Sequence, residues 1–88
     1  MERLEEQIIV DNPHGLHARP AALFVQIAGK FDSSVMLEKD GELVDGKSII
    51  AILSLGVNKG MGIKLIVEGL DAMQAFKELK NFLEKNND

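Results

Sequence analysis

The pair Asp40-Gly41 separates two short segments, 33–39 and 42–45, and restricts the folds open to this chain. Both central residues of a two-residue hairpin turn need a positive φ, which aspartate followed by glycine tolerates better than most pairs. The first segment carries valine and leucine at alternate positions, the period of a strand with one buried face. The pair therefore predicts a hairpin of two antiparallel strands.

Two further segments have the alternation of strands. In 6–10, Ile8 and Val10 fall on one face and Ile9 on the other. The segment 62–69 also contains a strand, with an isoleucine, a leucine and a valine on one face. These segments predict two more strands, one on each side of the hairpin in the sequence.

Three segments have the periodicity of helices: 18–30, ending near Gly29, then 48–55, and a last helix that starts near Asp71 as a suitable N-cap. The expected core stripes are Ala21, Phe24, Val25 and Ala28 in the first helix, and Ala72, Phe76, Leu79 and Leu83 in the last. Leu23 and Ile27 lie beside the first stripe. The helix 48–55 is apolar nearly all round, so either all of it is core or, as we favour, one exposed face marks a partner site.

The resulting order is β-α-β-β-α-β-α within 88 residues, a length that suits one domain spanning 1–88. Four strands and three helices in so short a chain predict an α+β fold. We expect an open-faced sandwich, in which three helices pack on one face of a four-stranded, mostly antiparallel sheet.

The stretch GELVDGKS, residues 41–48, fits the pattern of a nucleotide-binding P-loop. However, its first glycine belongs to the predicted hairpin turn and its middle residues to a predicted strand. A phosphate cradle needs consecutive backbone N–H groups in a loop. A P-loop enzyme also needs a parallel sheet, and 88 residues cannot supply several crossover connections of a dozen or more residues each. We therefore interpret the match as coincidental.

Composition argues against several classes of function. The chain has no cysteine, a net charge of -4, scattered basic residues and neither tyrosine nor tryptophan. It therefore offers no thiolate metal site and no basic, aromatic surface for nucleic acid. The start, MERLEEQIIV, is not typical of a signal peptide, and no apolar stretch approaches a membrane span. We expect a cytoplasmic protein without membrane insertion, metal or cofactor.

The most informative chemistry lies around His17, where a loop gives way to the first helix, with Pro20 in its first turn. Free backbone N–H groups and the helix dipole there favour a neutral imidazole, which is available as a nucleophile. The guanidinium of Arg19 could hold an attached anion. On local features alone, a capping histidine beside a solvated arginine is the simpler interpretation. His14 lacks an arginine two residues on, and we expect it to be an exposed loop residue.

A family resemblance favours the chemical interpretation of His17 over the capping one. The motif G-L-H-A-R-P at 15–20, followed by K-S-I at 47–49 and S-L-G at 54–56, resembles HPr. HPr is the histidine-containing phosphocarrier of the phosphoenolpyruvate-dependent sugar phosphotransferase system. The resemblance runs along essentially the whole chain, so it implies a single HPr-like domain that is a phosphocarrier and not an enzyme. We also expect a monomer.

The resemblance implies roles for matching residues. His17 would receive a phosphoryl group on Nδ1 from enzyme I and pass it to the IIA component of a sugar transporter. Arg19 would contact the phosphoryl oxygens, while Gly15 and Pro20 would shape the loop and the helix start. Partner docking would use Ala18, Ala22, Ile49, Leu53 and Val57.

Ser48 resembles a serine that a dedicated kinase, HPr kinase/phosphorylase, modifies in many members of the family. A serine before an apolar helical run is also explained as an N-cap. A phosphate there is tolerated at the helix N-terminus and adds surface charge. The alternative function is therefore a regulatory protein that acts through phospho-Ser48 with a transcription factor, without sugar transport. We expect Lys47 to be a rim charge near this serine.

The helix 48–55 departs from the family pattern at three positions. Ala51 replaces a common glycine, and Ile50 and Leu53 replace frequent methionines. Methionine adapts more readily at contact surfaces, so these changes bear on partner preference and leave the histidine chemistry untouched.

Overall fold

Residues 2–85, which the computed structural model describes, follow the predicted order β-α-β-β-α-β-α. The elements are β1 (Glu2–Ile9), α1 (Ala18–Gly29), β2 (Ser34–Lys39), β3 (Glu42–Asp45), α2 (Ile49–Leu55), β4 (Gly62–Gly69) and α3 (Ala72–Glu84). β1 begins earlier than the predicted segment 6–10, because its first residues are mostly charged and carry little apolar alternation. These residues belong to the strand because their backbone groups pair with β4, which an apolar pattern does not show.

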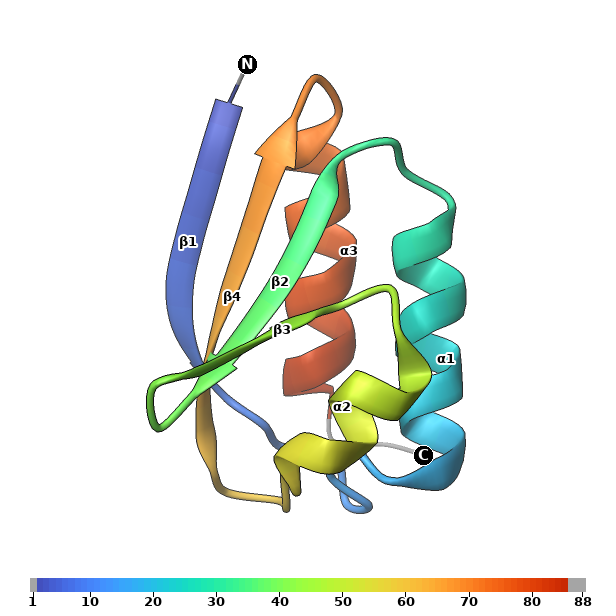
Figure 1. Ribbon diagram of the computed structural model, residues 1–88, viewed down its shortest axis with the longest axis vertical. Coiled ribbons are helices and arrows are strands. Elements are labelled where there is room, and N and C mark those ends of the chain that lie inside the picture. Colours follow the sequence, from blue (N-terminus) through green and yellow to red (C-terminus); the bar gives the residue numbers. More distant parts are fainter. Residues whose placement is uncertain (1, 86–88) are drawn as a thin grey trace.

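The strands form one sheet in the order β1-β4-β2-β3, and all three neighbouring pairs are antiparallel. The predicted turn joins β2 to β3, with φ of 52° at Asp40 and 84° at Gly41. Figure 1 shows β1 and β3 at the two edges of the sheet, each with one free side. The antiparallel hairpin predicted from this residue pair is confirmed.

The three helices cover one face of the sheet and leave the other uncovered (Figure 1). α3 packs on β1 and β4, α1 packs beside α3, and α2 contacts both α1 and β3. Lys80 of α3 reaches Glu6 of β1 at 2.7 Å, and this hydrogen bond raises the pKa of the lysine. The predicted α+β open-faced sandwich is confirmed. Within residues 2–85, no helix is both long enough and apolar enough to span a membrane.

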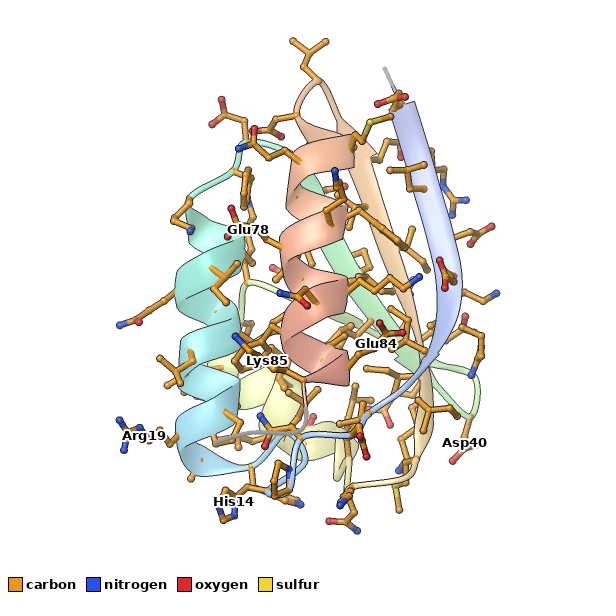
Figure 2. All side chains as sticks on the ribbon, turned by 180° about the vertical axis from the view of Figure 1, so that it is seen from behind. His14, Arg19, Asp40, Glu78, Glu84 and Lys85 are labelled. Atoms are coloured by element: carbon orange, nitrogen blue, oxygen red, sulfur yellow. The ribbon has the colours of Figure 1, made fainter. Side chains whose placement is uncertain are left out.

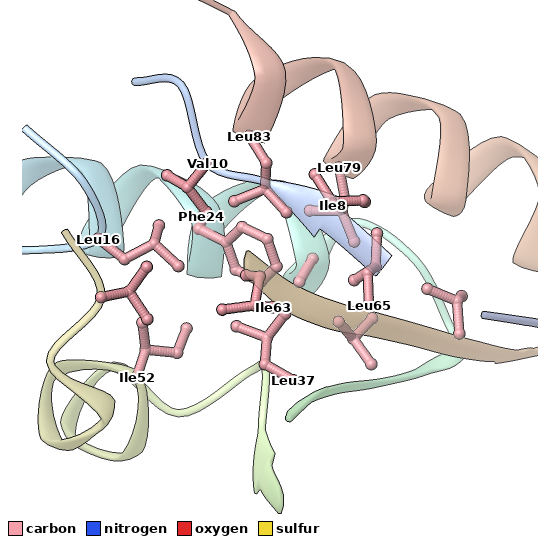
Figure 3. Close-up of a cluster of buried hydrophobic side chains, with 14 of the residues drawn as sticks. Ile8, Val10, Leu16, Phe24, Leu37, Ile52, Ile63, Leu65, Leu79 and Leu83 are labelled. Atoms are coloured by element: carbon pink, nitrogen blue, oxygen red, sulfur yellow. The ribbon is translucent and has the colours of Figure 1, made fainter. Parts of the chain in front are cut away.

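Phe24 of α1 is fully buried in the core between the helices and the sheet (Figure 3). Its ring centroid lies 6.3 Å from that of Phe82. Each large apolar side chain buried in this way stabilises the fold by roughly 1.5–3 kcal/mol. The largest fully buried side chains are Phe24, Ile8, Leu16, Leu37, Ile52, Ile63, Leu65, Leu79, Leu83, Val10, Val35 and Val57. The alternation predicted for β1 is confirmed, since Ile9 on the other face is 57% exposed.

Asp71 stands at the N-cap position of α3, but its side chain does not cap that helix. Its carboxylate accepts hydrogen bonds from the backbone N–H groups of Asp32, at 2.9 Å, and Ser33, at 3.0 Å, and from the Ser33 hydroxyl. The Ser33 hydroxyl, followed by the Asp32 N–H, lowers the pKa of this carboxyl. The predicted capping role is therefore wrong, because donors from the loop between α1 and β2 take the carboxylate.

α2 has the exposed face that its all-round apolar sequence predicts. Ile52 and Leu55 are buried, whereas Ile50 is 76% exposed and Ile49 and Leu53 are about half as exposed as Ile50. A helix of two turns that rests on α1 and β3 has a side that neither neighbour can cover. The interpretation that all of this helix belongs to the core is excluded.

Candidate functional site

His17 occupies the last extended position before α1, with φ of -103° and ψ of 159°. Its side chain is exposed and does not cap the helix. Ala18 then begins the helix with a φ of 33°, which is uncommon for a residue other than glycine and persists only where the surroundings hold it. Pro20 is buried in the first turn, where it lacks the N–H that would otherwise have no partner. At this helix start, the imidazole points outward, beside backbone N–H groups that have no acceptor within the helix.

The loop that carries His17 is tied to the turn that follows α2. Gly15 has a φ of 60°, and a Cβ built on it would collide with the carbonyl oxygen of Val57 and lie 2.9 Å from the Cα of Asn58. The N–H of Leu16 donates to the same Val57 carbonyl at 2.9 Å. Both chain segments lie at one end of the molecule, beside the start of α1 (Figure 1). Only glycine allows the two backbones to approach this closely with that φ.

The turn after α2 contributes a residue that sequence patterns did not single out. The amide oxygen Oδ1 of Asn58 lies 2.6 Å from Nε2 of His17. Asn58 lies between α2 and β4 and is 41 residues from the histidine. No local pattern could pair the two residues, because their contact depends on how the two loops pack.

His17 and Arg19 line one shallow depression at this end of the molecule. In Figure 2, the Arg19 side chain projects away from α1 toward solvent, and His14 projects from the preceding loop nearby. Within residues 2–85, no hydrogen bond or ion pair engages the Arg19 guanidinium. The full lining is Asn12, Pro13, His14, His17, Ala18, Arg19, Pro20, Leu23, Asn58, Lys59 and Phe82.

The electrostatics of this depression favour an anion. The N-terminal N–H groups of α1 carry partial positive charge, and the cationic side chains of Arg19 and Lys59 border the same space. Among residues 2–85, no three His, Asp or Glu side chains are grouped to hold a metal ion. Chemically, the arrangement is a solvent-facing imidazole with donors for the oxygens of an attached anionic group.

The residues expected to dock partners divide into two groups. Ala18 is exposed and Ala22 half-buried on α1, while Ile49 and Leu53 are 37% and 39% exposed on the neighbouring α2. α2 contacts α1, and exposed Leu23 of α1 lines the depression with His17. We call Ile49, Ile50 and Leu53, the exposed apolar side chains of α2, the apolar patch.

Val57 does not belong to this surface. Its side chain is fully buried and its carbonyl oxygen accepts from Leu16, so it supports the loop from below. The expectation that its side chain meets partners is therefore wrong for this conformation. It follows a glycine C-cap, Gly56, with a φ of 66°, which turns the chain inward after α2.

Ser48 caps α2, with its hydroxyl accepting from the N–H of Ala51 at 3.3 Å. The capping interpretation is thus confirmed, and Ser48 as a whole is half-buried. Lys47 beside it is not a free rim charge. Its Nζ donates to the carbonyl oxygen of Phe31 at 2.7 Å, because the chain before α2 passes the end of α1.

Comparisons with known proteins agree with this architecture. Residues 4–85 match the family model described as the PTS HPr component phosphorylation site. The chain is 48% identical over 82 residues to the HPr-like protein Crh of Halalkalibacterium halodurans, covering 93% of this chain and 98% of the relative. Its structure is similar to the phosphocarrier protein HPr from Bacillus anthracis, with a TM-score of 0.91, 40% identity, and coverage of 93% and 98%.

Two solved relatives contradict the expected monomer. HPr of Thermoanaerobacter tengcongensis, 54% identical over 82% of this chain with a TM-score of 0.69, was solved as a dimer. Crh of Bacillus subtilis, 42% identical over 94% of this chain with a TM-score of 0.77, forms a swapped, intertwined dimer. The monomer expectation is therefore wrong. A swapped dimer reuses the contacts of the single chain, so composition and periodicity carry no signal for it.

Proposed function

Because this chain belongs to the HPr family, we propose that it is a cytoplasmic phosphoryl carrier of the phosphotransferase system rather than an enzyme. It accepts a phosphoryl group on His17 from enzyme I and passes it to IIA components of sugar transporters. The observation that carries the proposal is the exposed imidazole of His17 in one depression with Arg19, beside the open N-terminus of α1.

The transfer is a displacement at phosphorus. The lone pair on Nδ1 of His17 forms the new nitrogen–phosphorus bond while the bond from phosphorus to the enzyme I donor atom breaks. No proton moves at Nδ1, and the phosphoryl oxygens remain anionic. They meet the guanidinium of Arg19 and the first N–H groups of α1, which stabilise charge without reorganising. Transfer to IIA runs the same displacement in the opposite direction.

The apolar patch supports the partner side of this proposal. Ile49 and Leu53 are exposed on α2, which contacts α1, and Leu23 of α1 lines the depression with His17. A carrier that serves two partners needs small interfaces with fast release. We assign enzyme I and IIA to this surface in turn, with Ala18 and Ala22 at its border.

A second candidate function is regulation through Ser48, and a specific observation favours it. The relative from Halalkalibacterium halodurans, at 48% identity, is a Crh protein, and Crh of Bacillus subtilis is described as a catabolite repression protein. In this chain Ser48 begins α2 beside the apolar patch. A phosphoserine there, made by HPr kinase/phosphorylase, would add charge at the docking surface. It would repel acidic phosphotransfer partners and create a surface for a transcription factor.

The experiment is incubation with labelled phosphoenolpyruvate and a cognate enzyme I. We expect one acid-labile, base-stable phosphoryl group, absent in His17→Ala and retained in His14→Ala, which removes the neighbouring loop histidine. The carrier proposal would be overturned if the wild type stayed unlabelled, or if His17→Ala were labelled to the same extent as the wild type. Labelling of Ser48 alone, by HPr kinase/phosphorylase with ATP, would favour the regulatory function.

A further inference from the structure

We propose that Asn58 is a positioning residue that fixes the tautomer of His17, so that the proton stays on Nε2 and Nδ1 presents its lone pair. The inference rests on the proposed function, since it explains how this chain prepares the atom that receives the phosphoryl group. The observation beneath it is the distance of 2.6 Å between Nε2 of His17 and Oδ1 of Asn58.

The chemistry of the two groups makes the contact selective. A neutral imidazole has one N–H donor and one nitrogen lone pair. The amide oxygen of Asn58 is an acceptor only, so a hydrogen bond to it requires the proton on Nε2. The other nitrogen, Nδ1, then carries the lone pair. The hydrogen bond of one ring nitrogen therefore decides the reactivity of the other.

The packing of the two loops holds Asn58 in place. Its carbonyl oxygen accepts from the N–H of Met61 at 3.1 Å, and its own N–H points to the sulfur of Met61 at 3.4 Å. On the other side, its Cα lies against Gly15, where a Cβ would come within 2.9 Å. The side chain of Asn58 thus starts from a backbone fixed against the loop that carries His17. Because this acceptor is already held in place, aligning the imidazole with it costs little conformational entropy.

The same contact acts during transfer. When Nδ1 forms its bond to phosphorus and Nε2 keeps its proton, the ring gains positive charge. A hydrogen bond from a charged donor to a carbonyl oxygen is stronger than one from a neutral donor. Asn58 therefore stabilises the phosphorylated ring more than the free ring, and this preference favours acceptance of the group.

The opposite orientation of the amide makes the opposite prediction. If the NH₂ group of Asn58 faced the ring, it would donate to a lone pair on Nε2 and leave the proton on Nδ1. Asn58 would then block the attacking atom. The two orientations differ in a property of the ring that can be observed without any partner protein.

The test uses long-range ¹H–¹⁵N spectra of the labelled full chain, at a pH where the ring is neutral. We expect the Nε2–H tautomer to dominate for His17 in the wild type and to give way to a mixture in Asn58→Ala. Asn58→Asp, which keeps an oxygen acceptor, should restore it. Asn81→Ala, at an exposed position on α3, serves as the matched control and should leave the tautomer unchanged. A dominant Nδ1–H tautomer in the wild type, or no change in Asn58→Ala, would overturn the proposal.

A kinetic arm separates this inference from the carrier function. Phosphorylation of Asn58→Ala by enzyme I should be slower by roughly tenfold, the effect expected for one hydrogen bond. An unchanged rate would overturn the role of Asn58 in transfer. If the tautomer behaves as expected but the wild type is never phosphorylated, the carrier function fails and the positioning of the ring by Asn58 stands.

Discussion

The backbone N–H of Ser33 donates to the carboxylate of Asp71 at 3.0 Å, although 38 positions separate the two residues. Together with the Ser33 hydroxyl and the N–H of Asp32, this contact joins the loop before β2 to the start of α3. It lies where the chain enters α3, away from the loop that carries His17 (Figure 1). Its contribution to stability can therefore be measured without disturbing the candidate site.

Asp71 should make stability depend on acidity. Its folded-state pKa is lowered from the ordinary value of 3.8, chiefly by the Ser33 hydroxyl. A lowered pKa stabilises the fold above the unfolded pKa, and the stabilisation is lost as pH falls through the folded pKa. Asp71→Asn should therefore lower the free energy of unfolding at pH 7, and the difference from the wild type should shrink below about pH 3.8. Urea unfolding across this range measures it.

Asp40→Asn is the control for this change, since asparagine also tolerates the positive φ of the hairpin turn. It removes a carboxylate but none of the contacts at Ser33. A stability difference for Asp71→Asn that stays constant from pH 7 to pH 2 would contradict the proposed linkage.

Gly15→Ala should destabilise the protein and disturb the His17 loop. Alanine at a φ of 60° is strained, and its Cβ would meet the backbone of Val57 and Asn58. We expect a loss of about 2 kcal/mol in unfolding free energy, from strain and displaced packing together. Gly29→Ala, in α1 with nothing within 4 Å of a new Cβ, should be neutral or stabilising. Equal effects of the two changes in thermal unfolding would refute the close approach at Gly15.

Two substitutions should separate the structural role of Ser48 from its regulatory role. Ser48→Ala removes the acceptor for the Ala51 N–H and should cost about 1 kcal/mol of unfolding free energy. Ser48→Asp keeps a capping oxygen and should retain most of that stability, yet slow phosphorylation by enzyme I because it adds charge beside the apolar patch. Chemical unfolding and initial-rate assays measure the two effects. Unimpaired transfer in a fully folded Ser48→Asp protein would count against the regulatory mechanism.

Arg19→Gln should slow acceptance of the phosphoryl group while leaving the fold intact, because the side chain has no partner within the described residues. Loss of one preorganised cationic donor at a reacting group lowers rates on the order of a hundredfold. Arg3→Gln removes the same charge from β1, outside the depression that His17 lines, and should have little effect. Similar rates for the two variants would show that net charge, and not the place of Arg19, governs transfer.

The sequence predicted most of the fold because its strongest signals are local. Asp40-Gly41 specified its hairpin through the φ values that each residue tolerates. The alternation of Ile8 and Ile9 and the apolar excess of α2 specified which side chains face solvent. These properties depend on neighbouring residues, so they survive into the folded chain.

The remaining features depend on contacts between distant segments. Asp71 has the residue type of an N-cap, but donors from the loop at Asp32 and Ser33 take its carboxylate. The family resemblance assigned Val57 to partner docking, but the turn at Gly56 directs the chain inward and the side chain is buried. The pairing of His17 with Asn58 had no local signature. His17 and Arg19, by contrast, could be identified as site candidates because one motif contains both.

The most direct measurement is the position of the phosphoryl group itself. We would phosphorylate ¹⁵N-labelled protein with phosphoenolpyruvate and enzyme I and record ¹⁵N–³¹P coupling in the imidazole spectra. We expect a single phosphoryl group, bonded to Nδ1 of His17, with Nε2 still protonated. A phosphoryl group on Nε2, on His14 or on no histidine would contradict it.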